Sequence, residues 1–270
     1  MKRYRLTKFF LDTSRNIFNQ PAGEHIDKAK EGLRSWLVAK YGTANFDEKF
    51  VRYMALQKPV FSVVSEHIQL LEDICGAYVQ GNMYSALTGA CCLGERIFND
   101  IIFRIKDDFK TSEHYKKIYN KGSIIDWPLA IQILFDWKVI DSETKEKYKE
   151  LYNLRTESVH YQQKQQDLEK LSLNAINVVN FIVERIFGVG PHRKDILLYF
   201  DVPGEVYIRK SAERNPIVKE YYIPSSSLVG PNFRMENAGK IGSFRIIDQK
   251  YEDKEITDQE FINLRKGIKK

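Results

Sequence analysis

The chain has 270 residues, of which 43% are hydrophobic, 13% aromatic and 29% charged. That length holds one large domain or two modest ones with an ample core, and the composition excludes a largely disordered chain. Lysine and arginine outnumber aspartate and glutamate by 42 to 36, a formal net charge of +6. This excess tolerates an anionic partner without requiring one, because charges of both signs are interleaved along the chain.

The three cysteines, Cys75, Cys91 and Cys92, lack the spacing of a metal site or a disulfide framework. Buried, reduced thiols in an apolar helix are the simpler interpretation of the adjacent pair. The most apolar later run, residues 175–189, is interrupted by Glu184 and Arg185 and predicts a buried helix rather than a membrane span. We therefore expect a cytoplasmic protein with no metal, cofactor or membrane contact.

Residues 1–23 read as an irregular lead-in. Apolar residues then recur in steps of three and four over 26–41, which predicts a helix that Gly42 ends. A short helix is expected over 46–56, before Pro59.

Two long helices follow, over residues 61–78 and 83–105. The first half of the second helix is rich in small residues, which let neighbouring backbones approach closely. We therefore expect it to be the packed central helix. The lysine-bearing connection at 106–123 is either a phosphate-contacting loop or a solvated one.

Three more helices are predicted before the chain changes character. One begins after Asp126, with Pro128 in its first turn. The next is capped at Asp141 and covers 142–160, and the last covers 167–187.

Beyond residue 191 the chain consists of short β-prone runs separated by proline and glycine, followed by a final helix. The runs are 196–200, 206–208, 218–223 and 244–247, and the helix is 258–265. Four aromatic residues of this region form either a stacking surface or a core: Tyr207, Tyr221, Tyr222 and Phe244. The predicted class is mainly α, with an N-terminal helical extension (1–60), a helical bundle (61–188) and a small β-containing C-terminal module (191–270).

The candidate chemistry lies at the end of the 142–160 helix, where Arg155 precedes His160 by five residues. Arginine keeps its proton at any working pH, whereas histidine exchanges one near neutrality. Such a pair can hold a phosphate and move a proton. On an ideal helix the two side chains point about 140° apart, so a distorted helix end or convergence in a cleft must bring them together.

Four segments in order are similar to the HEPN superfamily of helical domains. Residues 77–86 resemble its first helix junction, and 92–95 its step from apolar residues to glutamate. Residues 129–134, with Ile140 and Asp141, resemble its third helix, and 155–160 matches its Arg-x4-His motif. Residues 61–188 thus resemble this superfamily, which implies an antiparallel helical bundle and a homodimer whose two motifs face a shared cleft.

Catalytic HEPN proteins cleave RNA without a metal, using its own 2′-OH as the nucleophile. The resemblance gives His160 the proton transfer and Arg155 the stabilisation of phosphorane charge. Glu95 either orients Arg155 or the histidine across the bundle, or is an ordinary ion pair or exposed helical charge. The weaker substrate-binding candidates are Thr156, Ser158, Glu95 and Tyr161.

Two other functions stay open. A non-catalytic HEPN-like module could bind RNA, a nucleotide or a protein partner, and Thr156, where the family often has asparagine, favours that alternative. A sequence-specific DNA regulator ranks last, because no reading helix or basic stripe is evident. A role in defence or as a toxin rests on family analogy alone. The C-terminal module could bind substrate or a protein partner, or only cover the bundle.

Overall fold

The computed structural model describes residues 1–11, 14–57, 61–63, 66–159, 168–190, 198–199, 201–239, 244–252 and 254–268. The protein is mainly helical, as predicted, with short strands concentrated towards the C-terminus. Two compact units divide the chain. Unit 1 comprises Met1–Phe9 with Val189–Lys270, and unit 2 comprises Phe10–Gly188.

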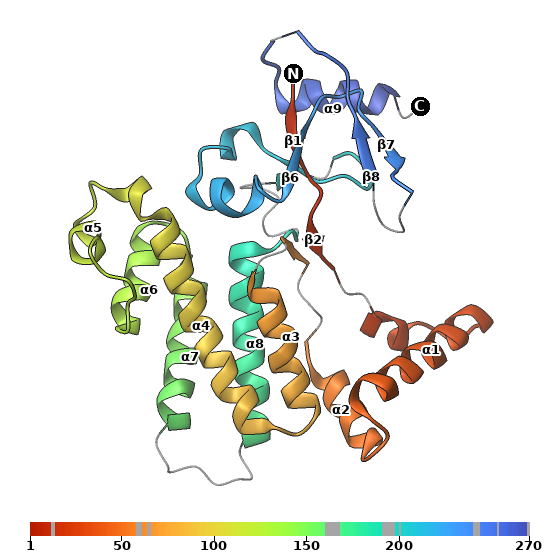
Figure 1. Ribbon diagram of the computed structural model, residues 1–270, viewed down its shortest axis with the longest axis vertical. Coiled ribbons are helices and arrows are strands. Elements are labelled where there is room, and N and C mark those ends of the chain that lie inside the picture. The colour runs from red at the N-terminus through yellow and green to blue at the C-terminus, as the bar shows by residue number, and fades with distance from the viewer. Residues whose placement is uncertain are drawn as a thin grey trace. The chain divides into compact units, whose positions relative to one another are not determined.

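Unit 2 is a helical bundle in which α3, α4, α7 and α8 lie side by side (Figure 1). Its α-helices are α1 (Glu24–Tyr41), α2 (Phe46–Ala55), α3 (Glu66–Val79), α4 (Met83–Ile105), α5 (Glu113–Ile118), α6 (Trp127–Asp136), α7 (Ser142–Val159) and α8 (Leu168–Phe187). Its shorter elements are η1 (Ser14–Asn19), β3 (Ser62–Val63) and η2 (Lys106–Phe109), while β2 (Phe9–Phe10) falls where the two units meet in sequence. The long helices follow the predicted ranges except at the start of the helix predicted over 61–78, where Ser62–Val63 form β3 and α3 begins at Glu66.

Helix α4 is the centre of the bundle, in contact with α3, α6, α7 and α8. Two of its glycines explain how close the neighbours come. A Cβ on Gly89 would lie 2.9 Å from Cγ1 of Ile74 on α3, and one on Gly94 would lie 2.3 Å from Cδ2 of Leu151 on α7. The expectation of a central helix packed through small residues is confirmed.

Side-chain caps start α6 and α7 where the sequence predicts. Asp126 accepts a hydrogen bond from the Leu129 N–H at 3.1 Å, and Asp141 accepts one from the Thr144 N–H at 2.8 Å. The caps satisfy donors that the first helical turn leaves unpaired. They also fix where each helix begins, and with it the direction in which its side chains point.

The connection over residues 106–123 is more ordered than a plain loop, since it contains η2 and α5. Ser112 caps α5 by accepting from the His114 N–H at 3.2 Å. Phe109 stacks on Trp137 with ring centroids 4.5 Å apart, and Ile118 is fully buried. These apolar anchors fold the segment back onto the bundle.

Unit 1 is built on an antiparallel sheet with the strand order β4-β5-β1-β6. These strands are β4 (Leu198–Tyr199), β5 (Tyr207–Ile208), β1 (Arg3–Leu6) and β6 (Ser226–Val229). The unit also contains η5 (Lys210–Ala212), η6 (Val218–Tyr222), the hairpin of β7 (Arg234–Asn237) with β8 (Phe244–Ile247), and α9 (Asp258–Ile268). Its core consists of Tyr199, Val202, Tyr207, Val229, Phe233, Ile256, Phe261 and Ile262.

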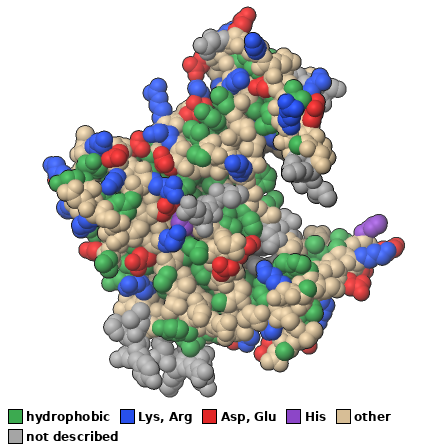
Figure 2. Space-filling model, viewed as in Figure 1, with side chains coloured by type: hydrophobic (Ala, Val, Ile, Leu, Met, Phe, Trp, Pro, Cys, Tyr) green, Lys and Arg blue, Asp and Glu red, His purple; other side chains and the backbone are tan. Residues whose placement is uncertain are grey.

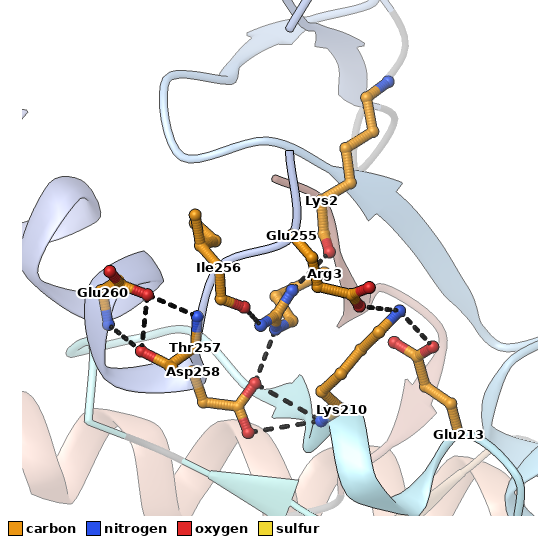
Figure 3. Close-up of polar contacts among 9 residues, drawn as sticks. All are labelled: Lys2, Arg3, Lys210, Glu213, Glu255, Ile256, Thr257, Asp258 and Glu260. Carbon is orange, nitrogen blue, oxygen red and sulfur yellow. Dashed lines mark hydrogen bonds and ion pairs between the residues drawn. The ribbon is translucent and has the colours of Figure 1, made fainter. Parts of the chain in front are cut away.

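The prediction of an irregular lead-in is wrong at β1, which is a strand between β5 and β6. Arg3 is 1% exposed, and its guanidinium donates to Oδ1 of Asp258 at 2.6 Å and to the carbonyls of Lys2 and Ile256 (Figure 3). The N-terminal strand is thereby fixed to the start of α9. Residues 1–9 thus group with residues 189–270, and residues 10–188 make up the other unit.

The predicted strand at 218–223 is also wrong, because Val218–Tyr222 forms a π-helical turn. Asn215 starts this turn by accepting from the N–H groups of Ile217 at 2.9 Å and Val218 at 3.3 Å. An asparagine cap followed by proline is a helix-start signal, and here it overrides the β preference of the aromatic and branched residues that follow.

The four aromatic residues predicted to form either a stacking surface or a core do not all share one environment. Tyr207, Tyr221 and Tyr222 are buried and belong to the core, whereas Phe244 is 62% exposed on β8.

In the described part of the chain, none of the helices combines the length and apolarity that crossing a bilayer demands.

Candidate functional site

Arg155 lies near the C-terminal end of α7, directly after a face that the bundle buries. Tyr148 and Leu151 are fully buried and Leu154 is 6% exposed, so the helix is rotated with this face towards the core. Arg155 follows at the border of that face, and 38% of its side-chain surface is exposed to solvent. The guanidinium is therefore both anchored on the bundle and open to solvent.

Glu95 of α4 is the partner of Arg155. The Nε atom of Arg155 is 3.5 Å from Oε2 of Glu95, and the indole Nε1 of Trp127 donates to the same oxygen at 3.0 Å. The guanidinium carbon is 5.9 Å from the Trp127 ring centroid. Three helices, α4, α6 and α7, thus join in one Arg–Glu–Trp cluster. The ion pair between Glu95 and Arg155 is compatible both with an orienting role for Glu95 and with a structural one.

Gly94 explains why this cluster can form. Because it has no side chain, Leu151 of α7 packs directly against the α4 backbone, and Trp127 lies behind it at 3.4 Å from the position a Cβ would take. Glu95 is the next residue on α4. The close approach of the two helices at Gly94 therefore brings Glu95 within reach of Arg155.

A groove of about 830 Å³ runs along α3 and α4 and ends at this cluster. Its polar and charged lining residues are Asp73, Ser85, Cys92, Glu95, Arg96, Asn99, Ser123 and Arg155. The two arginines and two carboxylates cancel in formal charge. Lysine, arginine and acidic side chains are likewise intermixed over the face seen in Figure 2.

Asn99 fixes the edge of the groove. Its amide nitrogen donates to the carbonyls of Glu95 and Ile124, both at 3.1 Å, and its amide oxygen accepts from the Ile124 N–H at 2.7 Å. The segment before α6 is thereby held against α4. Asn99 thus stabilises this edge through hydrogen bonds to the backbone of Glu95 and Ile124, and these bonds do not involve the guanidinium of Arg155.

The hydroxyls of Thr156 and Ser158 are engaged within their own helix. Thr156 donates to the Tyr152 carbonyl at 3.0 Å, and Ser158 donates to the Arg155 carbonyl at 2.8 Å. Each hydroxyl retains acceptor capacity but directs its proton to the backbone. His160 and Tyr161 lie outside the described residues.

The neighbouring cysteine is not a nucleophile in this arrangement. Burial, with a smaller contribution from Cys92, raises the pKa of the Cys91 thiol to about 12, while the charge of Arg155 acts in the opposite direction. Since the thiolate is the reactive form, Cys91 remains a protonated core residue at neutral pH. The expectation of buried thiols thus holds for Cys91 and is wrong for Cys92, which is exposed and lines the groove.

Sequence reasoning missed Trp127, Arg96 and Asn99 as members of this site. The Asp-Trp-Pro start of α6 marks Trp127 as a first-turn residue, but only the packing of α6 on α4 turns its indole towards Glu95.

No protein-family model matches this chain, and neither a curated protein nor a solved structure shows significant similarity to it.

Proposed function

We propose that this chain is a HEPN-like, metal-independent endoribonuclease with its site at the Arg155 end of the groove. One observation carries the proposal: a half-exposed guanidinium is held at the wall of a groove through its Nε edge by Glu95, which Trp127 in turn holds. That contact leaves the two Nη groups as donors for a phosphate, the geometry for which arginine is suited.

In the proposed reaction the 2′-oxygen of RNA attacks the adjacent phosphorus and the bond to the 5′-oxygen breaks. The products are a 2′,3′-cyclic phosphate and a 5′-hydroxyl. Arg155 stabilises the charge that develops on the phosphoryl oxygens. His160 transfers a proton to or from the reacting oxygens, since its ordinary pKa of about 6.5 suits that task near neutrality. Its part comes from the sequence motif.

Glu95 is a positioning residue in this proposal. Its carboxylate limits the rotamers of Arg155 and so lowers the entropy lost when a phosphate binds. Glu95→Gln keeps the size of the side chain and removes the charge. We expect it to change KM and the rate together without abolishing cleavage.

The proposal extends to the setting of the protein. The active form is a cytoplasmic homodimer that acts in defence or as a toxin, with the C-terminal module available to a protein partner. Light scattering on the purified full chain tests the dimer. Expression in a bacterial host tests toxicity, which the wild type should show and an Arg155→Ala variant should not.

The decisive experiment is cleavage of 5′-labelled RNA by the full chain with EDTA present. Arg155→Ala should lower the rate about 100- to 1000-fold, and His160→Ala about 100- to 10,000-fold. Arg104→Ala and His25→Ala are the matched controls, because Arg104 lies on α4 outside the groove and His25 is exposed on α1. RNA with a 2′-deoxy residue at the cut position should resist cleavage.

A non-catalytic binding module is the second candidate. It is favoured by the cancelling charges of the groove and by the hydroxyls of Thr156 and Ser158, which bond to their own helix. Filter binding with the same RNA separates the two. If the folded wild type retains RNA in a manner that depends on Arg155 but yields no product after long incubation, the protein is a binding module and not a ribonuclease.

A further inference from the structure

Unit 2 contains a second cavity, which shares no lining residue with the Arg155 groove. It has a volume of about 430 Å³ and lies among η1, α1, α2, α3 and α8. Small-molecule sites in proteins range from about 300 to 1,000 Å³ and are mostly apolar, with a few converging polar groups. The size is thus that of a compact ligand.

Aromatic and aliphatic side chains make up most of the walls of this cavity. Phe10, Trp36, Tyr41 and Tyr53 line it, together with aliphatic side chains of α1, α3 and α8. Trp36 is 48% exposed, a large aromatic surface for a helix to leave uncovered. Aromatic walls favour a flat ring, which stacks or packs edge-to-face against them.

One wall carries a buried polar group that has no partner among the described residues. Ser62 of β3 is 1% exposed, lines the cavity, and makes no side-chain hydrogen bond within the described part of the chain. Its backbone is fixed by a β-bridge to Gly188. A buried hydroxyl left unsatisfied destabilises the folded state. A ligand group that forms a hydrogen bond with it therefore binds more tightly, because the bond offsets that cost.

Asn180 of α8 adds a second polar group to the same cavity. It is 5% exposed and lines the wall, and its amide offers both a donor and an acceptor. A polar residue in the middle of a buried helical face is costly unless something pairs with it. Ser62 and Asn180 together define a polar end in an otherwise apolar site.

The charges at this cavity indicate an uncharged ligand. Lys40 and Glu72 are the two lining residues that carry full charges at neutral pH, and these cancel. The Lys40 ammonium lies 4.9 Å from the Trp36 ring centroid and 5.4 Å from that of Tyr41, so it is already engaged with the aromatic wall. An ion would enter without a net counter-charge, at a cost in desolvation.

We propose that this cavity is a binding site for an uncharged, planar aromatic molecule with a hydrogen-bonding group at one end. The ring lies against the aromatic wall that includes Trp36, and the polar group bonds to Ser62 and Asn180. This site is independent of the proposed ribonuclease activity.

The probe for the test is Prodan, a neutral naphthalene with a ketone at one end, whose fluorescence shifts to the blue in apolar surroundings. Titration of the full chain should give saturable, blue-shifted emission. Ser62→Ala should raise the Kd about fivefold, the value of one hydrogen bond. The same variant should leave the melting temperature of the unliganded protein unchanged or higher, because it removes an unsatisfied hydroxyl.

Trp36→Ala removes part of the wall at a half-exposed position and should raise the Kd about tenfold. Tyr119→Ala, at a similarly exposed tyrosine outside the cavity, and Arg155→Ala should leave it unchanged. Unsaturable binding, or a Kd that neither cavity variant alters, would overturn the proposal. So would competition by 1-decanol at a lower concentration than unlabelled aromatic ketone, which would assign the cavity to an aliphatic chain.

Discussion

At the scale of single residues, the candidate site depends on a glycine, Gly94, which has no Cβ. Gly94 gives Leu151 access to the α4 backbone, and the side chains on either side of that contact are Glu95 and Arg155. A larger residue at position 94 would press against a fully buried leucine with Trp127 behind it. The separation of α4 and α7 is therefore set by one glycine.

We predict that Gly94→Ala destabilises the protein by about 1–3 kcal/mol, the usual cost of an added methyl group in a packed core. Urea denaturation followed by circular dichroism measures the change. Gly76→Ala on α3 is the control, because a Cβ there meets nothing within 4 Å. That change should be neutral or stabilising. Equal stability of the two variants would show that α4 and α7 separate freely.

At the scale of elements, α9 is tied to unit 1 by Arg265. Its Nε and Nη2 atoms donate to the two carboxylate oxygens of Glu205 at 3.1 and 2.9 Å. Its Nη1 donates to the carbonyls of Pro231 and Phe233 at 3.0 and 2.8 Å. Tyr207 also donates to Glu205. The helix begins at a reciprocal cap between Thr257 and Glu260, shown in Figure 3.

Arg265→Met should destabilise unit 1 by about 3–5 kcal/mol, since it leaves the Glu205 carboxylate buried without its cation. Hydrogen exchange of the amides in residues 198–268 measures this loss. The double variant Glu205→Gln with Arg265→Met should recover part of it. Arg214→Met, at an exposed arginine, is the control. A loss no larger than that of the control would mean that α9 docks through its apolar face alone.

At the scale of the whole molecule, we predict that three buried tyrosines set the alkaline limit of stability. Burial raises the pKa of Tyr148 in unit 2 and, together with nearby carboxylates, the pKa values of Tyr199 and Tyr207 in unit 1. Their folded pKa values exceed the unfolded value of about 10. Their contribution to stability is therefore complete below about pH 10 and is lost as the pH rises through the folded values.

We predict that these three tyrosines ionise only as the protein unfolds. Phenolate absorbance and circular dichroism, recorded together above neutrality, test this. Tyr148→Phe should shift the alkaline midpoint upwards and keep stability at pH 7, because the Tyr148 hydroxyl has no partner among the described residues. Full tyrosine ionisation before any loss of helicity would contradict the prediction.

Local signals in the sequence were enough for most of the bundle. Apolar periodicity located α1, α3, α4 and α8, and the caps at Asp126 and Asp141 located α6 and α7. These signals act within a few residues along the chain. The wrong strand at 218–223 also has a local cause, because Asn215 and Pro216 start a helical turn here, whereas the same pair is equally typical of a break between strands.

The sequence by itself determined the mainly helical class and the central role of α4 in the bundle. Tertiary structure alone decided that β1 joins the C-terminal module, because strand pairing depends on partners far away in the chain and leaves no periodic pattern in four residues. It also decided that Trp127 holds Glu95 and that a cavity lies between α1 and α3. Both depend on how separate helices pack, which the pattern of any one helix does not contain.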